Sequence, residues 1–365
     1  MIRPGVSCVS CGYAYPSGMH PYRCPVCSGL FDYEGGFPFD YGLVEQEQPG
    51  IWRYRHTFGL PAQLSPVSLG EGNTPLVWTE VLGRSVALKC EYLNPSGSFK
   101  DRGSSVITSW LRGQGVTEAL EDSSGNAGAS FAAYAARIGM RARIFVPESA
   151  SGPKRKQIEA YGAELVPVAG TRTEVAEAAR EVAESGMAYA SHAYLPFNLA
   201  GYATAAYEIV EQLGRLPGTV LVPAGQGGLL LGLSRGFDAL RIATKFTIIP
   251  KMIGVQALAC APLYTMSTGQ DMINRAGLEK PTLAEGVRVR DPLRAIAVLS
   301  AVQRSQGWMY AVEESEILPA RDGLAKLGFY VEPTSAIVWA ALFQFMDKLP
   351  DPIVLILTGS GMKYG

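Results

Sequence analysis

The sequence carries almost no net charge and no long apolar run. It contains 32 basic and 33 acidic residues, which gives a formal net charge of -1. Such a balance supplies no field that would attract a nucleic-acid backbone or an anionic membrane surface. The most apolar stretches, 221–233 and 353–357, are short or interrupted by glycine, and a membrane-spanning helix needs roughly 18 apolar residues. We therefore expect no nucleic-acid partner and no membrane span.

Histidine is also scarce. The three histidines are His20, His56 and His192, and nothing around them suggests a Ser-His-Asp triad. Each is expected to be structural. The chain reaches Cys8 without an apolar run of signal-peptide length, which predicts a cytoplasmic location.

Four of the six cysteines lie close to the N-terminus and form two CxxC pairs that are twelve residues apart: Cys8, Cys11, Cys24 and Cys27. In a reducing compartment such pairs are metal ligands rather than disulfides. Their spacing predicts a zinc ribbon over residues 1–34, in which four thiolates leave no open coordination position, so that the zinc is structural. Cys90 and Cys260 are expected to be buried small hydrophobic residues.

From about residue 68 onward, short β-branched runs alternate with alanine-rich helical stretches. The expected strands are 142–147, 163–168, 219–223, 253–256 and 353–357. The expected helices are 126–138, 153–161, 173–184, 199–213 and 334–349. This alternation predicts parallel sheets with helices on both faces.

The segment Pro-Ser-Gly-Ser-Phe-Lys-Asp-Arg-Gly at 95–103 is a small-residue turn that places Lys100 at the start of a predicted helix. An isolated Ser-x-Lys would indicate a surface lysine. Phe99 and the glycines at 97 and 103 instead suit a confined pocket, where burial lowers the pKa of a lysine and makes its amine a nucleophile toward an aldehyde.

Three glycine-rich loops follow predicted strands, at 123–128, 224–228 and 358–361. The first has Asn126, whose amide either caps a helix or reaches the edge of a flat ring. The second offers backbone N–H groups to a phosphate and lacks the GxGxxG spacing of a dinucleotide site. The third has Thr358, either a turn former or a donor to a ring nitrogen. Because ligands bind at the carboxyl ends of strands in open α/β sheets, the loops predict one composite site.

These four motifs in this order resemble the fold-type II pyridoxal-phosphate enzymes, the tryptophan synthase β-like family, over residues 68–363. Within that family, the lysine motif and the ending Thr-Gly-Ser-Gly-Met-Lys at 358–363 are most similar to threonine synthases. The resemblance implies two αβα domains with pyridoxal phosphate in the cleft between them, in addition to the ribbon. The implied large domain comprises 35–97 and 205–365, and the smaller inserted domain comprises 98–204.

The resemblance also implies the cofactor contacts. Lys100 would bind the cofactor covalently, Asn126 would contact its phenolic oxygen, and Thr358 would lie at the pyridine nitrogen. The implied phosphate-binding residues are Gly225, Gln226, Gly227, Gly228 and Leu229. A neutral hydroxyl at the ring nitrogen favours elimination and replacement over transamination.

The substrate contacts depart from the threonine synthase pattern. Where many threonine synthases have Asn, Arg, Gln and Lys, this chain has Leu195, Asn198, Tyr202 and Ala203. A phosphate leaving group needs charge-assisted donors, and Lys154 is the favoured candidate, although its charge run is equally typical of a solvated helix start. The other candidate substrate-binding residues are Ser98, Arg102, Ser124 and Asn198.

Two enzymatic hypotheses follow for a small-molecule amino-acid substrate. One is threonine synthase, which converts O-phosphohomoserine and water to threonine and phosphate. The other is a serine or threonine ammonia-lyase that produces a 2-oxo acid. A non-catalytic binding protein of the same fold is disfavoured by the intact lysine, asparagine and hydroxyl set, and a homodimer is possible.

Overall fold

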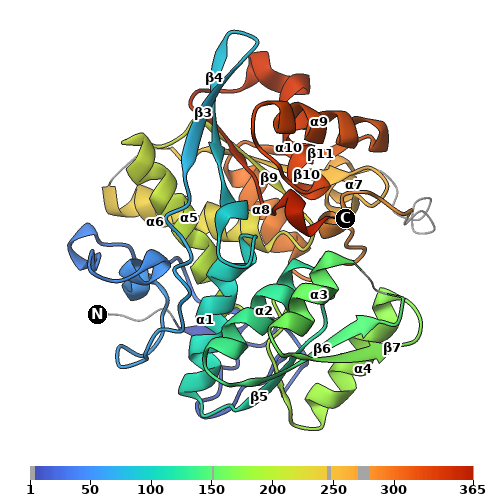
Figure 1. Ribbon diagram of the computed structural model, residues 1–365. Coiled ribbons are helices and arrows are strands. Elements are labelled where there is room, and N and C mark those ends of the chain that lie inside the picture. The colour runs from blue at the N-terminus through green and yellow to red at the C-terminus, as the bar shows by residue number, and fades with distance from the viewer. Residues whose placement is uncertain (1–4, 150–151, 245–247, 270–279, 365) are drawn as a thin grey trace. The chain divides into compact units, whose positions relative to one another are not determined.

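The structure is a computed structural model that describes residues 5–149, 152–244, 248–269 and 280–364. The chain divides into two compact units, which are shown together in Figure 1. Unit 1 comprises residues 1–72, 94–201 and 364–365, and unit 2 comprises 73–93 and 202–363. The boundaries at 34, 97 and 204 that the sequence suggested stay predictions.

Unit 1 contains a four-stranded sheet in the order β7-β6-β5-β8, in which all neighbouring strands are parallel. Its strands are β5 (Glu118–Glu121), β6 (Arg141–Pro147), β7 (Glu164–Val168) and β8 (Ala188–Tyr189). Its helices are α1 (Lys100–Gly113), α2 (Asn126–Arg137), α3 (Pro153–Ala160) and α4 (Arg172–Glu184). Because all strands are parallel, their carboxyl ends lie at one edge of the sheet, where the loop that leads to Asn126 begins.

The N-terminal ribbon lies in unit 1. Its strands β1 (Val6–Cys8) and β2 (Phe31–Tyr33) form an antiparallel pair, and two 3₁₀ segments follow, Tyr41–Leu43 and Gly50–Thr57. The ring of Tyr15 packs against Trp110 of α1 and against Phe197, with centroid distances of 5.7 and 5.4 Å. The ribbon therefore shares an aromatic core with the helix that begins at Lys100.

Unit 2 contains a six-stranded sheet in the order β11-β10-β9-β12-β4-β3, which is parallel except for the antiparallel edge strand β3. Its strands are β3 (Leu76–Val81), β4 (Arg84–Lys89), β9 (Thr219–Pro223), β10 (Lys251–Ala257), β11 (Trp308–Val312) and β12 (Ile353–Ile356). Its longer helices are α5 (Phe197–Leu213, which begins in unit 1), α6 (Gly228–Thr244), α7 (Pro262–Thr268), α8 (Ala295–Arg304), α9 (Glu314–Lys326) and α10 (Pro333–Phe345). Short 3₁₀ turns are Glu91–Leu93, Glu285–Val287, Met346–Lys348 and Gly361–Lys363.

The core of unit 2 lies between this sheet and α10. The first ten residues of α10 are all buried, as expected of a helix that is apolar all round. Strand β12 is buried along its whole length, so the sequence reads as a continuous apolar run rather than an alternating one. Cys90 and Cys260 are buried, which confirms the expectation for both.

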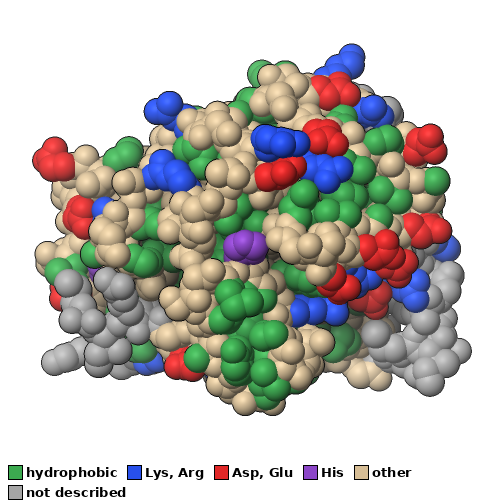
Figure 2. Space-filling model, turned by 90° about the horizontal axis from the view of Figure 1, so that it is seen from below, with side chains coloured by type: hydrophobic (Ala, Val, Ile, Leu, Met, Phe, Trp, Pro, Cys, Tyr) green, Lys and Arg blue, Asp and Glu red, His purple; other side chains and the backbone are tan. Residues whose placement is uncertain are grey.

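The surface carries charges of both signs. Figure 2 shows one face of the molecule, on which Lys and Arg side chains lie among Asp and Glu side chains. In the described part of the chain, no helix is long and apolar enough to cross a membrane.

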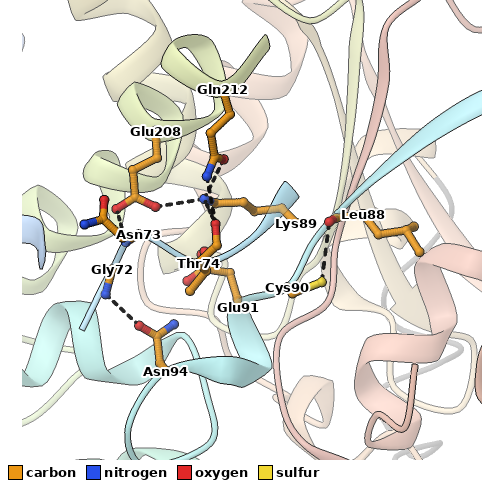
Figure 3. A network of polar contacts seen from close by, with 10 residues as sticks. All are labelled: Gly72, Asn73, Thr74, Leu88, Lys89, Cys90, Glu91, Asn94, Glu208 and Gln212. Carbon is orange, nitrogen blue, oxygen red and sulfur yellow. Dashed lines mark hydrogen bonds and ion pairs between the residues drawn. The ribbon is translucent and has the colours of Figure 1, made fainter. Parts of the chain in front are cut away.

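A buried ion pair anchors the start of unit 2. Lys89 and Glu208 are almost completely buried, and their Nζ and Oε2 atoms are 2.8 Å apart. The ammonium of Lys89 also donates to the carbonyl of Thr74 and to Oε1 of Gln212, while Glu208 accepts from the backbone N–H of Asn73 (Figure 3). Because a buried charge is tolerated only when it is paired and hydrogen-bonded, this network fixes β4 and α5 to the chain segment at Asn73 and Thr74.

The predicted elements agree with the observed ones within a few residues. The clearest matches are β6, β9 and β12 among the strands and α2, α3 and α4 among the helices. The parallel α/β fold class is confirmed in both units.

Candidate active site

The lysine motif forms a tight turn at the start of α1. The N–H of Gly97 donates to the carbonyl of Asn94 at 2.7 Å, and Gly97 has a φ of +89°, a conformation that favours glycine. Lys100 is the first residue of the helix and is half-buried, with its Nζ 5.0 Å from the centroid of the Phe99 ring. The turn therefore holds the amine against an aromatic face, partly out of water. The role of Lys100 in binding a cofactor stays a prediction.

Asp101 ties this turn to α2. Its Oδ2 accepts from the backbone N–H of Ser96 at 2.6 Å, and its Oδ1 accepts from the hydroxyls of Ser96 at 2.5 Å and Ser130 at 2.6 Å. Asp101 is fully buried. It is not among the site residues predicted from the sequence, although an aspartate in the first turn of a helix is a recognisable signal.

The loop before α2 requires glycine for a geometric reason. A Cβ at Gly128 would overlap the carbonyl oxygen of Ser123, so only glycine lets the first turn of the helix approach the loop so closely. Asn126 is the first residue of α2 and is half-buried. Its helix follows directly from the carboxyl end of β5.

Two acidic residues lie at the carboxyl end of β5, Glu121 as its last residue and Asp122 directly after it, and each has a different partner. Glu121 Oε1 lies 2.7 Å from Nδ1 of His192, while Asp122 Oδ2 accepts from Arg172 at 2.5 Å. Burial, and then the charge of Asp122, raises the pKa of Glu121 well above its usual range. Burial, and then the charge of Lys100, lowers the pKa of His192 well below its usual range. Sequence reasoning missed this pair and treated His192 as structural.

The candidate substrate residues occupy different environments within unit 1. Ser98 is fully buried, and its hydroxyl has no hydrogen-bond partner among the described residues. Arg102 is completely buried within α1, and Ser124 is half-buried in the loop before Asn126. Asn198 donates from Nδ2 to the carbonyl of His192 at 2.5 Å, and its Oδ1 has no partner in the described structure.

Lys154 lies in the first turn of α3. It is half-buried, and Gln157, three residues later on the same helix face, donates to the carbonyl of Ser96 at 3.0 Å. Of its two charged neighbours, Arg155 pairs with Glu159 and Lys156 is exposed. The face of α3 that carries Lys154 therefore contacts the turn that precedes Lys100.

In unit 2, the glycine loop between β9 and α6 is closely packed. A Cβ at Gly225 would lie 2.9 Å from the carbonyl oxygen of Gly286 and 3.1 Å from Cα of Val287, and Gly227 has a φ of +77°. The side chain of Gln226 has a structural contact, since its Oε1 accepts from the backbone N–H of Leu293 at 3.0 Å. Gly228 and Leu229 open a 17-residue helix, and the first N–H groups of a helix lack acceptors within it and favour an anion.

Thr358 follows the carboxyl end of β12 and is buried. Its Oγ1 lies 3.0 Å from the hydroxyl of Ser335 on α10, and Ser335 also accepts from the N–H of Gly359 at 2.9 Å. The Ser335 contact orients the threonine hydroxyl. This supporting residue was not predicted from the sequence.

Each of the two compact units supplies groups that suit a part of pyridoxal phosphate. Unit 1 supplies a partly desolvated amine and, at Ser98, a buried hydroxyl that has no hydrogen-bond partner in the part of the chain that the structure describes. Unit 2 supplies a glycine-rich loop at a helix N-terminus, suited to a phosphate, and an oriented hydroxyl at Thr358. The assignments of individual residues to the cofactor stay predictions.

The four N-terminal cysteines form one cluster that could hold a metal ion. Their Sγ atoms all lie within 4.8 Å of one another, with 3.4 Å between Cys8 and Cys27 and 3.6 Å between Cys11 and Cys24. Each pair ends in a turn whose next residue has positive φ, Gly12 at +72° and Ser28 at +58°.

Comparison with known proteins decides the family. Residues 67–359 match the family described as pyridoxal-phosphate dependent enzyme. The chain belongs to this family. It is 33% identical to the threonine synthase of Methanocaldococcus jannaschii over 98% of this chain and 92% of that protein. It is 31% identical to the threonine synthase of Methanosarcina acetivorans with the same coverage.

Among solved structures, the threonine deaminase of T.th. is 32% identical, with a TM-score of 0.66 over 80% of this chain and 94% of that one. The family and these relatives make the protein a pyridoxal-phosphate dependent lyase that resembles threonine synthases. The match extends through the residues that form the ribbon, because it covers nearly the whole chain in the first two relatives.

Proposed function

We propose that the protein converts O-phosphohomoserine and water to threonine and phosphate. The observation that carries this proposal is the identity of 33% to a threonine synthase over 98% of the chain. The lysine turn, the glycine loop and the terminal hydroxyl are the parts that such an enzyme needs, and each is formed within its own unit.

When bound, pyridoxal phosphate withdraws electrons from the substrate and stabilises negative charge at its α-carbon. Lys100 Nζ would hold the cofactor through its aldehyde carbon and carry protons at the substrate. Asn126 would orient the ring, and the N–H groups of residues 225–229 would bind its phosphate. The hydroxyl of Thr358, oriented by Ser335, would lie at the ring nitrogen without charging it.

The leaving phosphate needs a cationic partner in unit 1. Lys154 suits this role, because it is half-buried on the face of α3 that contacts Ser96, whereas Lys156 is exposed and Arg155 is paired. Ser98, Ser124 and Arg102 would assist it. Asn198 suits a phosphate less well, because the atom that lacks a partner among the described residues is the acceptor Oδ1, and a phosphate needs donors.

The same observation on Asn198 favours a second candidate function. A neutral, acceptor-bearing side chain at this position would suit an amino acid with an uncharged hydroxyl side chain, and the threonine deaminase of T.th. is 32% identical to this chain. The alternative is therefore a serine or threonine ammonia-lyase that produces a 2-oxo acid.

We also propose that the four cysteines hold one structural zinc. Tetrahedral zinc with Zn–S bonds of about 2.3 Å separates its sulfur ligands by roughly 3.8 Å, which is close to the separations of 3.4 and 3.6 Å within the cluster. Thiolates of this kind persist in a reducing compartment such as the cytoplasm. The homodimer suggested by the sequence stays a prediction.

The product distinguishes the two functions. O-phosphohomoserine should give equal amounts of threonine and inorganic phosphate, while threonine or serine alone should give little 2-oxo acid.

A further inference from the structure

Glu121 and His192 are brought together by the sheet of unit 1. Strands β5 and β8 are parallel neighbours, with Leu120 opposite Tyr189, and Ala190 donates to the carbonyl of Leu120 at 2.8 Å. Glu121 is the last residue of β5, and His192 follows β8 by three residues. Both side chains therefore lie at the carboxyl edge of the sheet, where the loop to Asn126 also begins.

The carboxylate of Glu121 is buried and only half satisfied. Its side chain is 1% exposed, and Oε2 has no hydrogen-bond partner among the described residues, while Oε1 contacts Nδ1 of His192 at 2.7 Å. The neighbouring Asp122, by contrast, is hydrogen-bonded to both Arg172 and Tyr189. An isolated buried carboxylate is costly unless it can take up a proton.

The imidazole of His192 lies between this carboxylate and solvent. Its side chain remains 20% exposed, and the structure gives Nε2 no partner among the described residues. The backbone around it is held firmly. Ser191 accepts from the N–H groups of Ala193 and Tyr194 in a turn, and Asn198 donates to the carbonyl of His192.

The charged groups that face the pair come from four elements. Lys100 lies at the start of α1, Asp122 after β5, Arg172 on α4 and Tyr189 in β8, and charge interactions link the pair to them. Burial raises the pKa of Glu121, while burial and the positive charge of Lys100 lower the pKa of His192. The ring therefore favours its neutral form, and the carboxylate takes up a proton more readily than an exposed carboxylate does.

We propose that Glu121 and His192 form a proton-transfer pair that takes up the proton which the Lys100 ammonium must lose. Nε2 of His192 accepts that proton, directly or through one water molecule. The proton on Nδ1 passes to Oε1 of Glu121. The ammonium becomes an amine, the carboxylate becomes a carboxylic acid, and the ring is neutral before and after. The reverse transfer returns the proton.

The transfer is favourable because it neutralises two charges in a partly buried site. Before it, one positive and one negative group are out of water, and after it none is. The proposal rests on Lys100 as the reactive lysine of the proposed function. It does not depend on whether the substrate is O-phosphohomoserine or threonine.

The first arm of the test is NMR of the holoenzyme labelled with ¹⁵N-histidine. The chain has three histidines, so the His192 signals are identified by their loss in His192→Gln. We expect a neutral ring with one protonated nitrogen throughout pH 6 to 8. A ring that carries protons on both nitrogens at pH 7 would overturn the proposal, whatever the substrate proves to be.

The second arm is kinetic and uses whichever amino acid the parent enzyme turns over. Glu121→Gln preserves the size of the side chain but cannot take a proton, and we expect kcat to fall by about tenfold to a hundredfold or more. In His192→Ala we expect kcat to fall by a similar factor and to recover in part when imidazole is added. A purely structural role of His192 would not allow this recovery. His56→Gln, a histidine elsewhere in unit 1, should retain the parent rate.

A Glu121→Gln enzyme with the parent kcat, or a His192→Ala enzyme that imidazole does not rescue, contradicts the pair. Absence of threonine formation in the parent enzyme contradicts only the proposed substrate, because the NMR arm is independent of turnover.

Discussion

Arg23 of the ribbon binds Tyr194 in two ways. Its Nη2 donates to the tyrosine hydroxyl at 2.7 Å, and its guanidinium carbon lies 4.8 Å from the centroid of the tyrosine ring. Tyr22 packs against the same ring at 5.1 Å and donates its hydroxyl to Glu184 at 2.8 Å. Because Tyr194 lies two residues after His192, the ribbon supports the segment that carries one half of the proposed proton-transfer pair.

Loss of the metal should therefore affect more than the ribbon. We expect one zinc per chain by metal analysis, and none in Cys11→Ser, whose cysteine is exposed. Removal of the zinc should increase amide hydrogen exchange in residues 5–34, which form the ribbon. The contacts of Arg23 and Tyr22 predict faster amide hydrogen exchange in residues 189–198 too.

Arg23→Ala is the matched variant for this prediction, since it leaves the four cysteines in place. It should retain zinc, lose about 1 kcal/mol of local stability, and raise exchange in 189–198 about fivefold. Parent-like exchange in 189–198 after zinc removal would show that the ribbon is independent of this segment.

Parts of the candidate site could be predicted from the sequence because they depend on the local conformation of the backbone. The turn at Gly97, the glycine loops and the paired cysteines each need a particular residue type at a particular φ or spacing, and that need can be read in the chain. Glu121, His192 and Ser335 could not be found in this way. Their roles arise from strand pairing and helix packing between segments that are distant in sequence, and no periodicity records which carboxylate will face which histidine.

Lys100 should be the lysine that holds the cofactor. The purified protein should be yellow, and borohydride reduction followed by peptide mapping should place the cofactor on Lys100. Lys100→Ala should retain no cofactor after reduction and denaturation. Lys156→Ala, which alters an exposed lysine, should behave like the parent. An adduct on any other lysine would refute the assignment.

Lys154 should recognise the leaving phosphate. In Lys154→Ala we expect kcat/KM for O-phosphohomoserine to fall by about tenfold to a hundredfold, as is typical for loss of a charge-assisted hydrogen bond of about 1.5 to 3 kcal/mol. The absorbance of the bound cofactor should be unchanged. Lys156→Ala again serves as the control. An equal loss in both variants would mean that the charge run as a whole, not Lys154, matters.

The dependence of folding stability on pH should reveal the buried pair. The pKa of Glu121 is raised in the folded state. Its contribution to folding stability is therefore fully present below its unfolded-state pKa of about 4.3 and is lost as the pH rises through its folded-state pKa. The pKa of His192 is lowered, so its contribution is lost as the pH falls below about 6.5.

Urea unfolding between pH 5 and 8 should then separate the two groups. His192→Gln should show a weaker loss of stability on the acid side than the parent, and Glu121→Gln a weaker loss on the alkaline side. Identical pH profiles for the parent and both variants would mean that neither group changes its pKa on folding.

The central claim is tested most directly by incubating the purified holoenzyme with O-phosphohomoserine and, separately, with threonine and serine. Threonine, inorganic phosphate and 2-oxo acid should be measured side by side. The account predicts that O-phosphohomoserine gives threonine and phosphate in equal amounts, with little 2-oxo acid from the other two amino acids. Release of a 2-oxo acid from threonine or serine, with no threonine from O-phosphohomoserine, would contradict it and establish the ammonia-lyase alternative.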